Sequence, residues 1–116
     1  MHVSHKPLNA DPNSKIKAAV IAVFFSVEDY DHSIDESHNQ TLQLFFDELK
    51  LNNFYSSDKS DAGYIDYGLD QLDFVEAMDV FDFNDRWVYL GCDTLPPCTQ
   101  LIYWNVLRKV YPIELK

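Results

Sequence analysis

Residues 86–107 constrain the fold of this chain more than any other stretch. Residues 87–90 favour a strand, and the predicted strand ends at Gly91. Pro96 and Pro97 cannot lie inside a paired strand, because each proline locks φ and lacks a backbone N–H. The pattern therefore predicts a strand, a stiff loop and a second strand.

The second strand is indicated by alternation, since successive side chains of a strand point to opposite faces. Thr94 stands just before the prolines, so its hydroxyl is expected on a rigid loop between two strands. Rigid loops on sheets often hold catalytic groups; the alternative is a plain strand corner with an exposed threonine. The alternating residues form two sets, Leu101, Tyr103 and Asn105 on one face and Ile102, Trp104 and Val106 on the other.

Composition places the chain among folded proteins and bounds its partners. With 116 residues it is one domain or part of one, and an apolar share of 47% suffices for a packed core. A formal charge of −10 disfavours nucleic acid and anionic membranes as partners. The longest apolar run, residues 18–25, is too short to span a bilayer, so no transmembrane segment is expected. Residues 1–11 are polar and show no signal peptide.

Two further elements are predicted from periodicity. Residues 16–27 form a near-continuous apolar run, which is typical of a strand buried on both faces. Apolar residues recur at helical spacing over 42–49, which predicts an amphipathic helix. A surface connection is expected over 28–39 and a loop over 52–63. Residues 64–84 fit either short strands or irregular structure, and their acidic side chains lack the spacing of a calcium loop.

The four histidines and two cysteines are the candidate metal-binding and redox groups. His2 and His5 are three residues apart, so on a regular strand they point to opposite faces and cannot bind one metal. At most one of them could therefore bind a given metal, and the alternative is that both are solvated side chains of a frayed terminus. His32 and His38, at or before the predicted helix, are expected to be solvated. Cys92 and Cys98 flank the proline loop and pair only if their Cα atoms lie within about 7 Å, which leaves both states open.

A longer motif surrounds the prolines. Its residues are Tyr89, Gly91, Thr94, Pro96, Pro97, Cys98, Trp104, Val106, Leu107, Pro112 and Ile113. The motif resembles the α-class carbonic anhydrases, whose usual pattern reads Tyr-x-Gly-Ser-Leu-Thr-Thr-Pro-Pro followed by Trp, Val-Leu and Pro-Ile. The spacing from Pro96 to Trp104 matches. More weakly, residues 17–27 are similar to the family's long apolar strand, and residues 1–5 to the strand with the third zinc histidine.

The resemblance implies a β-dominated mixed α/β fold. It would be a largely antiparallel, twisted sheet with a central buried strand and at least one covering helix. Residues 1–116 would form a single partial domain of this kind. Because a truncated sheet exposes strand edges, a protein partner or a missing chain segment is expected to complete it.

The resemblance also implies a site. In the family, zinc held by three histidines lowers the pKa of a bound water to about 7, and the resulting hydroxide attacks carbon dioxide to give bicarbonate. His2 would be a zinc ligand and Thr94 the hydroxyl that orients the hydroxide. The substrate pocket would be formed by Val20, Leu95, Ile102 and Trp104.

The chain departs from the family pattern at several positions. It contains no His-x-His pair, so zinc is expected only if the missing ligands are supplied. Asp93 stands in place of an apolar pocket residue and Leu95 in place of a second threonine. Cys98 pairs, in extracellular members, with a cysteine that this chain lacks. An unpaired Cys98 is interpreted either as the sign of a missing segment or as a buried small apolar residue. The presence of Cys98 favours a secreted member of the family, although the compartment itself is unknown.

Three functional hypotheses follow. The first is an α-carbonic anhydrase, a carbonate dehydratase of the lyase class, of which this chain is a fragment or a partner-completed half that is inactive alone. The second is a catalytically dead carbonic anhydrase-related subunit with a structural role in a larger assembly. The third is an unrelated β-rich binding module that carries the Thr-Leu-Pro-Pro-Cys motif by chance.

Overall fold

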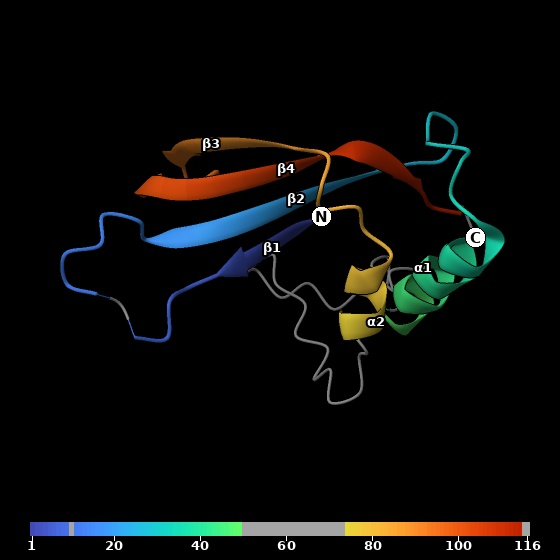
Figure 1. The fold of residues 1–116 in the computed structure, drawn as a ribbon, viewed down its shortest axis with the longest axis horizontal. Coiled ribbons are helices and arrows are strands. Elements are labelled where there is room, and N and C mark those ends of the chain that lie inside the picture. The colour runs from blue at the N-terminus through green and yellow to red at the C-terminus, as the bar shows by residue number, and fades with distance from the viewer. Residues whose placement is uncertain (10, 50–73, 115–116) are drawn as a thin grey trace, which may run out of the picture.

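The computed structural model describes residues 1–9, 11–49 and 74–114. These residues form four strands and two helices (Figure 1). The loop predicted over 52–63 and the segment 64–73 lie outside the described residues. The prediction of short strands or irregular structure over 64–84 is wrong for Phe74–Asp79, which form a helix. The elements are β1 (His2–His5), β2 (Ala18–Ser26), α1 (Glu36–Glu48), α2 (Phe74–Asp79), β3 (Arg86–Cys92) and β4 (Gln100–Pro112).

The strands form one mixed sheet in the order β1–β2–β4–β3. The two outer pairs, β1 with β2 and β3 with β4, are antiparallel. The central pair, β2 with β4, is parallel. The strand-dominated α/β architecture is thus confirmed, and so is the strand–loop–strand of residues 86–107. The long connection from β2 to β4, through α1, α2 and β3, allows this parallel pairing, which a tight turn could not connect.

β2 lies between β1 and β4 and contributes to both faces of the sheet. Val20 and Ala22 are buried on one face, and Val23 is buried on the other. The prediction of a strand buried on both faces is therefore confirmed for most of its length. The exception is Phe24, which is exposed because the register with β4 shifts between Ala22 and Phe24.

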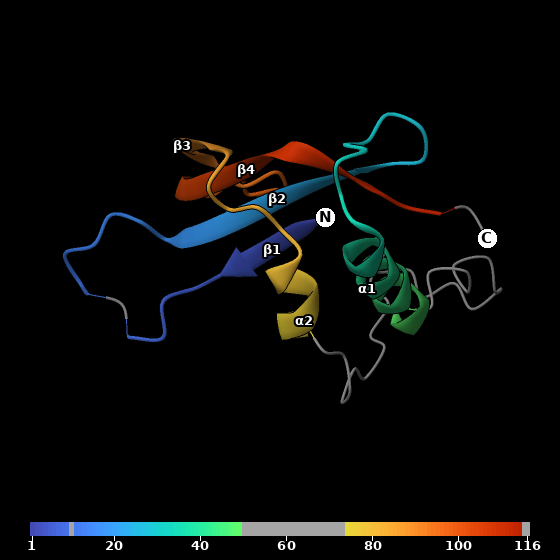
Figure 2. The ribbon, with the colours of Figure 1, turned by 45° about the vertical axis from the view of Figure 1, so that its right-hand side comes forward.

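The two helices cover one face at one end of the sheet (Figures 1 and 2). Leu42 of α1 packs there with Val23 of β2, and Met78 of α2 packs against the same cluster. The buried members of this cluster are Val23, Leu42, Phe81, Leu107 and Tyr111. In the described part of the chain, no helix is long and apolar enough to cross a membrane.

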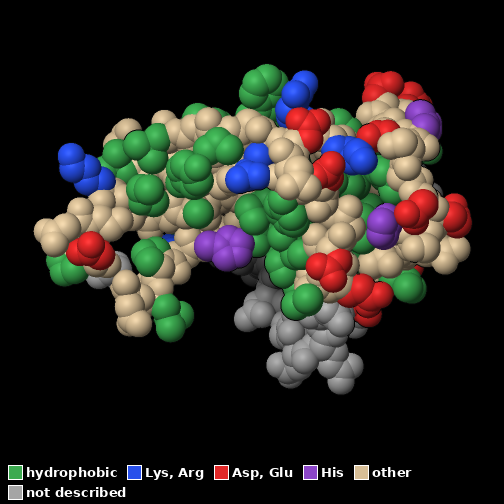
Figure 3. Space-filling view, in the orientation of Figure 1, with side chains coloured by type: hydrophobic (Ala, Val, Ile, Leu, Met, Phe, Trp, Pro, Cys, Tyr) green, Lys and Arg blue, Asp and Glu red, His purple; other side chains and the backbone are tan. Residues whose placement is uncertain are grey.

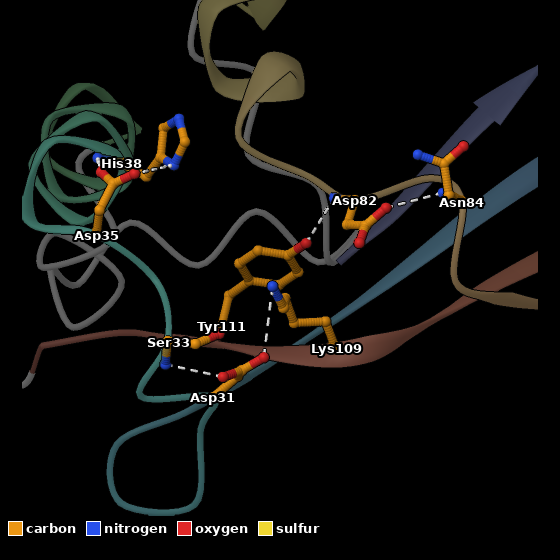
Figure 4. A network of polar contacts seen from close by, with 8 residues as sticks. All are labelled: Asp31, Ser33, Asp35, His38, Asp82, Asn84, Lys109 and Tyr111. Atoms are coloured by element: carbon orange, nitrogen blue, oxygen red, sulfur yellow. Dashed lines mark hydrogen bonds and ion pairs between the residues drawn. The ribbon is translucent and has the colours of Figure 1, made fainter.

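The helix predicted over 42–49 is confirmed, but it begins earlier, at Glu36. The reason is its cap: the Asp35 carboxylate accepts the His38 backbone N–H at 2.9 Å. This bond lowers the pKa of the Asp35 carboxyl below its usual value. The His38 ring lies 3.0 Å from the same carboxylate and remains exposed, as predicted (Figure 4).

Tyr111 ties the end of β4 to the segment before β3. Its ring is buried, and its hydroxyl accepts the Asp82 backbone N–H at 2.7 Å (Figure 4). Burial raises the pKa of the Tyr111 hydroxyl above its usual value. Next to it, the Lys109 ammonium lies 3.4 Å from the Asp31 carboxylate and holds the loop after β2 against β4.

Truncation of the buried Leu42 should destabilise the fold strongly. Leu42→Ala removes a side chain with no exposed surface, so the free energy of unfolding should fall by about 2–5 kcal/mol. Leu44→Ala is the matched control, because Leu44 is in the same helix but 65% exposed, and it should change stability by no more than about 0.5 kcal/mol. Urea unfolding measures both, and equal losses would contradict this packing.

Tyr111→Phe should lower stability and change its pH dependence. Loss of the hydroxyl leaves the Asp82 N–H without its acceptor, at a cost of about 1–3 kcal/mol. Because the pKa of folded Tyr111 is raised, its contribution is complete below the unfolded pKa of about 10 and declines as pH rises above it. The difference in stability between wild type and Tyr111→Phe should therefore shrink above about pH 10.

Tyr103→Phe is the control for this titration, because Tyr103 lies on the same strand with its ring exposed. Urea unfolding between about pH 8 and pH 11 compares the two variants. A constant difference between wild type and Tyr111→Phe across that range would show that the buried hydroxyl does not resist ionisation.

Candidate functional site

Trp104 is the centre of the candidate site. It lies on β4 and is only 5% exposed. Its Nε1–H donates to the Cys92 carbonyl oxygen at 3.0 Å. Tyr89, its partner in the β3–β4 register, stacks on it with ring centroids 6.2 Å apart and planes 9° apart. One polar bond and one stacked ring thus fix the orientation of the indole.

His2 reaches Trp104 from the other side of β2. Their ring centroids are 5.1 Å apart and the rings meet edge-on at 75°. In the β1–β2 register His2 lies opposite Ala22, and this small side chain leaves room for the imidazole above β2. The Val23 N–H donates to the Met1 carbonyl oxygen at 2.9 Å, which extends the pairing beyond His2 and holds its backbone in place.

Apolar side chains form the floor beneath the two rings. They are buried on the same face of the sheet as Trp104 and come from the two central strands: Ala18, Val20 and Ala22 from β2, and Ile102 from β4. The structure thus brings predicted ligand His2 and predicted pocket residues Val20, Ile102 and Trp104 to one face. His5, opposite Ala19 in the register, falls on the other face, as predicted.

Thr94 and Leu95 lie in the loop between β3 and β4. The Asp93 N–H donates to the Thr99 carbonyl, and the Cys98 N–H donates to the Leu95 carbonyl, each at 2.8 Å. Within the described residues, the Thr94 hydroxyl has no hydrogen-bond partner. Leu95 is 65% exposed. That the Thr94 hydroxyl and Leu95 belong to the pocket of His2 stays a prediction.

The cysteines at the two ends of this loop are unpaired. Cys92 and Cys98 are free and exposed. The interpretation of Cys98 as a buried small apolar residue is therefore wrong. The cause is the backbone: Cys98 adopts a positive φ of 55° in a loop that extends from the sheet into solvent.

The donor atoms near His2 do not make a zinc site by themselves. A catalytic zinc takes three protein ligands, whereas the described part of the chain contains no group of three His, Cys, Asp or Glu side chains that could hold a metal ion. His2 is the one predicted ligand, and its neighbour across the register is Ala22. The residues present therefore do not fit zinc without donors from elsewhere.

Away from this site, a hollow of about 350 Å³ lies between the loop after β2, the segment before β3, and β4. Two of its four carboxylates, those of Asp31 and Asp85, pair with its two basic side chains. Asp31 pairs with Lys109 at 3.4 Å, and Asp85 pairs with Arg108 at 3.2 Å. These pairs link segments that are distant in sequence, which indicates a structural role. On the face shown in Figure 3, acidic side chains gather at the end with α1 and apolar ones over the sheet.

Two features of the site were not found in the sequence. One is the stacking of Tyr89 on Trp104; the other is the pair of small residues, Ala18 and Ala22, that give the floor its shape. Tyr89 could have been found by pairing the two predicted strands in register, since it lies opposite Trp104. The alanines gave no signal, because a near-continuous apolar run does not show which neighbours each residue will meet.

Comparison of the chain with models of known protein families, with curated proteins and with solved structures finds no match.

The contact between His2 and Trp104 can be tested by NMR. Trp104→Leu removes the ring current of the indole, so the His2 ring protons should shift more than those of the other three histidines. Trp87→Leu is the matched control, because Trp87 is exposed on β3 and should leave the His2 resonances in place. Equal shifts in both variants would remove His2 from this site.

Proposed function

We propose that this chain is an α-carbonic anhydrase-like domain that does not hydrate carbon dioxide by itself. The observation that carries this proposal is the arrangement on one sheet face: the His2 imidazole stands beside Trp104, over an apolar floor that includes Val20 and Ile102. These are four of the five positions assigned by the resemblance to the ligand and the pocket of that family; the fifth is Leu95.

The chemistry of the floor suits carbon dioxide. The substrate is small, linear and without a net dipole, so buried apolar side chains hold it without competing for hydrogen bonds. The nearest buried polar group, the Trp104 N–H, is already occupied by the Cys92 carbonyl. The Thr94 hydroxyl in the adjoining loop has no partner among the described residues, which leaves it available to orient a nucleophile.

The missing donors would have to come from one side of His2. Adjacent strands lie about 4.8 Å apart, and Zn–N bonds are about 2.0–2.1 Å long, so further ligands must sit on a neighbouring strand. On the β2 side that neighbour is Ala22. In the described part of the chain, β1 has no strand on its other side. This free edge is where a partner or another segment would complete the sheet.

The purified chain with added zinc should not accelerate hydration of carbon dioxide, because one histidine cannot hold the metal. Stopped-flow measurements with a pH indicator should give the uncatalysed rate. A sulfonamide-sensitive rate above this background would contradict the proposal.

The second candidate, a catalytically dead interaction subunit, is favoured by the single ligand and by Asp93, whose charge stands where the family has an apolar residue. The two candidate functions can be distinguished by joining a designed strand that contains His-x-His to the chain ahead of β1 and measuring zinc binding. If the domain can be completed, one zinc should bind per chain and binding should be lost in His2→Ala. Zinc binding that His2→Ala leaves unchanged, or no binding, favours the dead subunit. His5→Ala, on the opposite face, is the matched control.

A further inference from the structure

β3 has an unpaired outer edge that is apolar on both faces. Within the described residues it pairs with β4 alone. Its side chains from Trp87 to Leu90 are between 44% and 60% exposed. Open strand edges are templates for pairing with another chain, and proteins usually protect them with charges, prolines or bulges. Residues 87–90 of β3 carry no such protection; its one charge, Arg86, and its register shift, between Gly91 and Cys92, lie at the two ends of the strand.

The hydrogen bonds to β4 reveal which backbone groups of β3 are free. The Arg108 N–H donates to the Asp85 carbonyl at 3.1 Å, so these two residues form a hydrogen-bonded pair. Such pairs alternate along an antiparallel ladder. Trp87 and Tyr89 therefore also form hydrogen-bonded pairs with β4. The N–H and C=O groups of the alternate residues, Arg86, Val88 and Leu90, point outward.

Side chains on the two faces of β3 differ in kind. One face carries the aromatic rings of Trp87 and Tyr89, with the Arg108 guanidinium 4.7 Å from the centre of the Trp87 ring. The other face carries Val88 and Leu90. It also carries Arg86, whose side chain donates to two neutral oxygens, Oδ1 of Asn105 at 3.0 Å and the Phe83 carbonyl.

We propose that β3 pairs antiparallel with β3 of a second copy of this chain, about a two-fold axis at Val88. In this register Val88 faces Val88 of the second copy, and Arg86 faces Leu90 in both directions. Each of the three pairs joins outward-pointing groups and makes two backbone hydrogen bonds. Trp87 then lies opposite Tyr89 of the second copy, twice, so four rings form one row across the junction.

Two criteria, charge and the direction of the backbone N–H and C=O groups, favour this register over the alternative registers of the two β3 strands. A register that places a residue with outward-pointing backbone groups opposite one whose groups point toward β4 forms no hydrogen bonds between the copies. An axis at Arg86 places two guanidinium groups opposite each other. An axis at Tyr89 brings Asp85 opposite Asp93 and extends the pairing into the register shift between Gly91 and Cys92. The axis at Val88 sets no like charges opposite and stays clear of that shift.

Two-fold axes at the two remaining positions give less favourable pairing of the β3 strands. An axis at Leu90 also needs regular pairing at Cys92, beyond the register shift, and sets Trp87 opposite Asp93. An axis at Trp87 pairs only residues 86–88 of the strand. The axis at Val88 is the one that uses all outward groups of residues 86–90 and joins aromatic rings to aromatic rings.

The junction is small and the two copies repel each other. Each copy has a formal charge of −10, whereas the contact itself is apolar and carries a cation, Arg86. The dimer should therefore be weak and dependent on concentration. It should also strengthen with salt, because salt screens the repulsion between the copies. A dimer held by ion pairs would show the opposite dependence. Pairing at the β3 edge does not depend on the proposed function.

A cysteine at position 88 tests the register directly. Val88→Cys, in full-length chain with Cys92→Ser and Cys98→Ser, places the new thiol opposite its own copy. The Cα atoms of such a pair lie about 5.5 Å apart, within the range of a disulfide. Oxidation should yield a covalent dimer. Leu90→Cys and Arg86→Cys should not link to themselves, but a mixture of the two should link. No covalent dimer through position 88, or equal self-linking at position 90, overturns the proposal.

Sedimentation equilibrium tests the association without cross-linking. From about 0.05 M to about 0.5 M NaCl, the fraction of dimer should rise at fixed protein concentration. Val88→Lys places two like charges opposite each other and should give a monomer at every NaCl concentration in this range. Leu44→Lys, at an exposed site on α1, is the control and should dimerise as wild type does. Circular dichroism checks that both variants fold. A monomeric wild type, or a Val88→Lys dimer of unchanged strength, overturns the proposal.

Discussion

The parallel pairing of β2 with β4 is the constraint on which the rest of the structure depends. Parallel strands cannot be joined by a tight turn, so everything between them, α1, α2 and β3, belongs to the crossover. The pairing sets Val20 opposite Trp104 and Ala18 opposite Ile102, which creates the apolar floor of the candidate site. On the other face it sets Val23 near Leu107, where the helices pack.

Much of the local structure could be predicted from the sequence. The alternation over residues 101–106, the loop at Pro96 and the apolar stripe of α1 each express a repeat that a few neighbouring residues reveal. What the sequence did not show depends on partners far along the chain. The parallel pairing of β2 with β4 and the exposure of Phe24 follow from contacts between distant segments, which a local sequence pattern does not reveal.

The candidate site shows the same division. The resemblance grouped His2, Val20 and Trp104. Alternation alone could not have done so, because only the register between β1, β2 and β4 shows which faces coincide. Thr94 was correctly expected on the loop between the two strands. The course of that loop could not be predicted, since it is set by hydrogen bonds such as that between Asp93 and Thr99 rather than by a repeat. The incomplete ligand set, in contrast, could be predicted, because the sequence contains no His-x-His pair.

The distance in sequence between β2 and β4 also sets an order of folding. Contacts between residues as distant as Val20 and Trp104 form late, because closing so long a loop costs entropy before any contact stabilises it. The β3–β4 hairpin needs only a short loop, so we expect it to form first. Until β2 arrives, both edges of this hairpin are open, and the Trp104 ring has only Tyr89 and the Cys92 carbonyl to hold it.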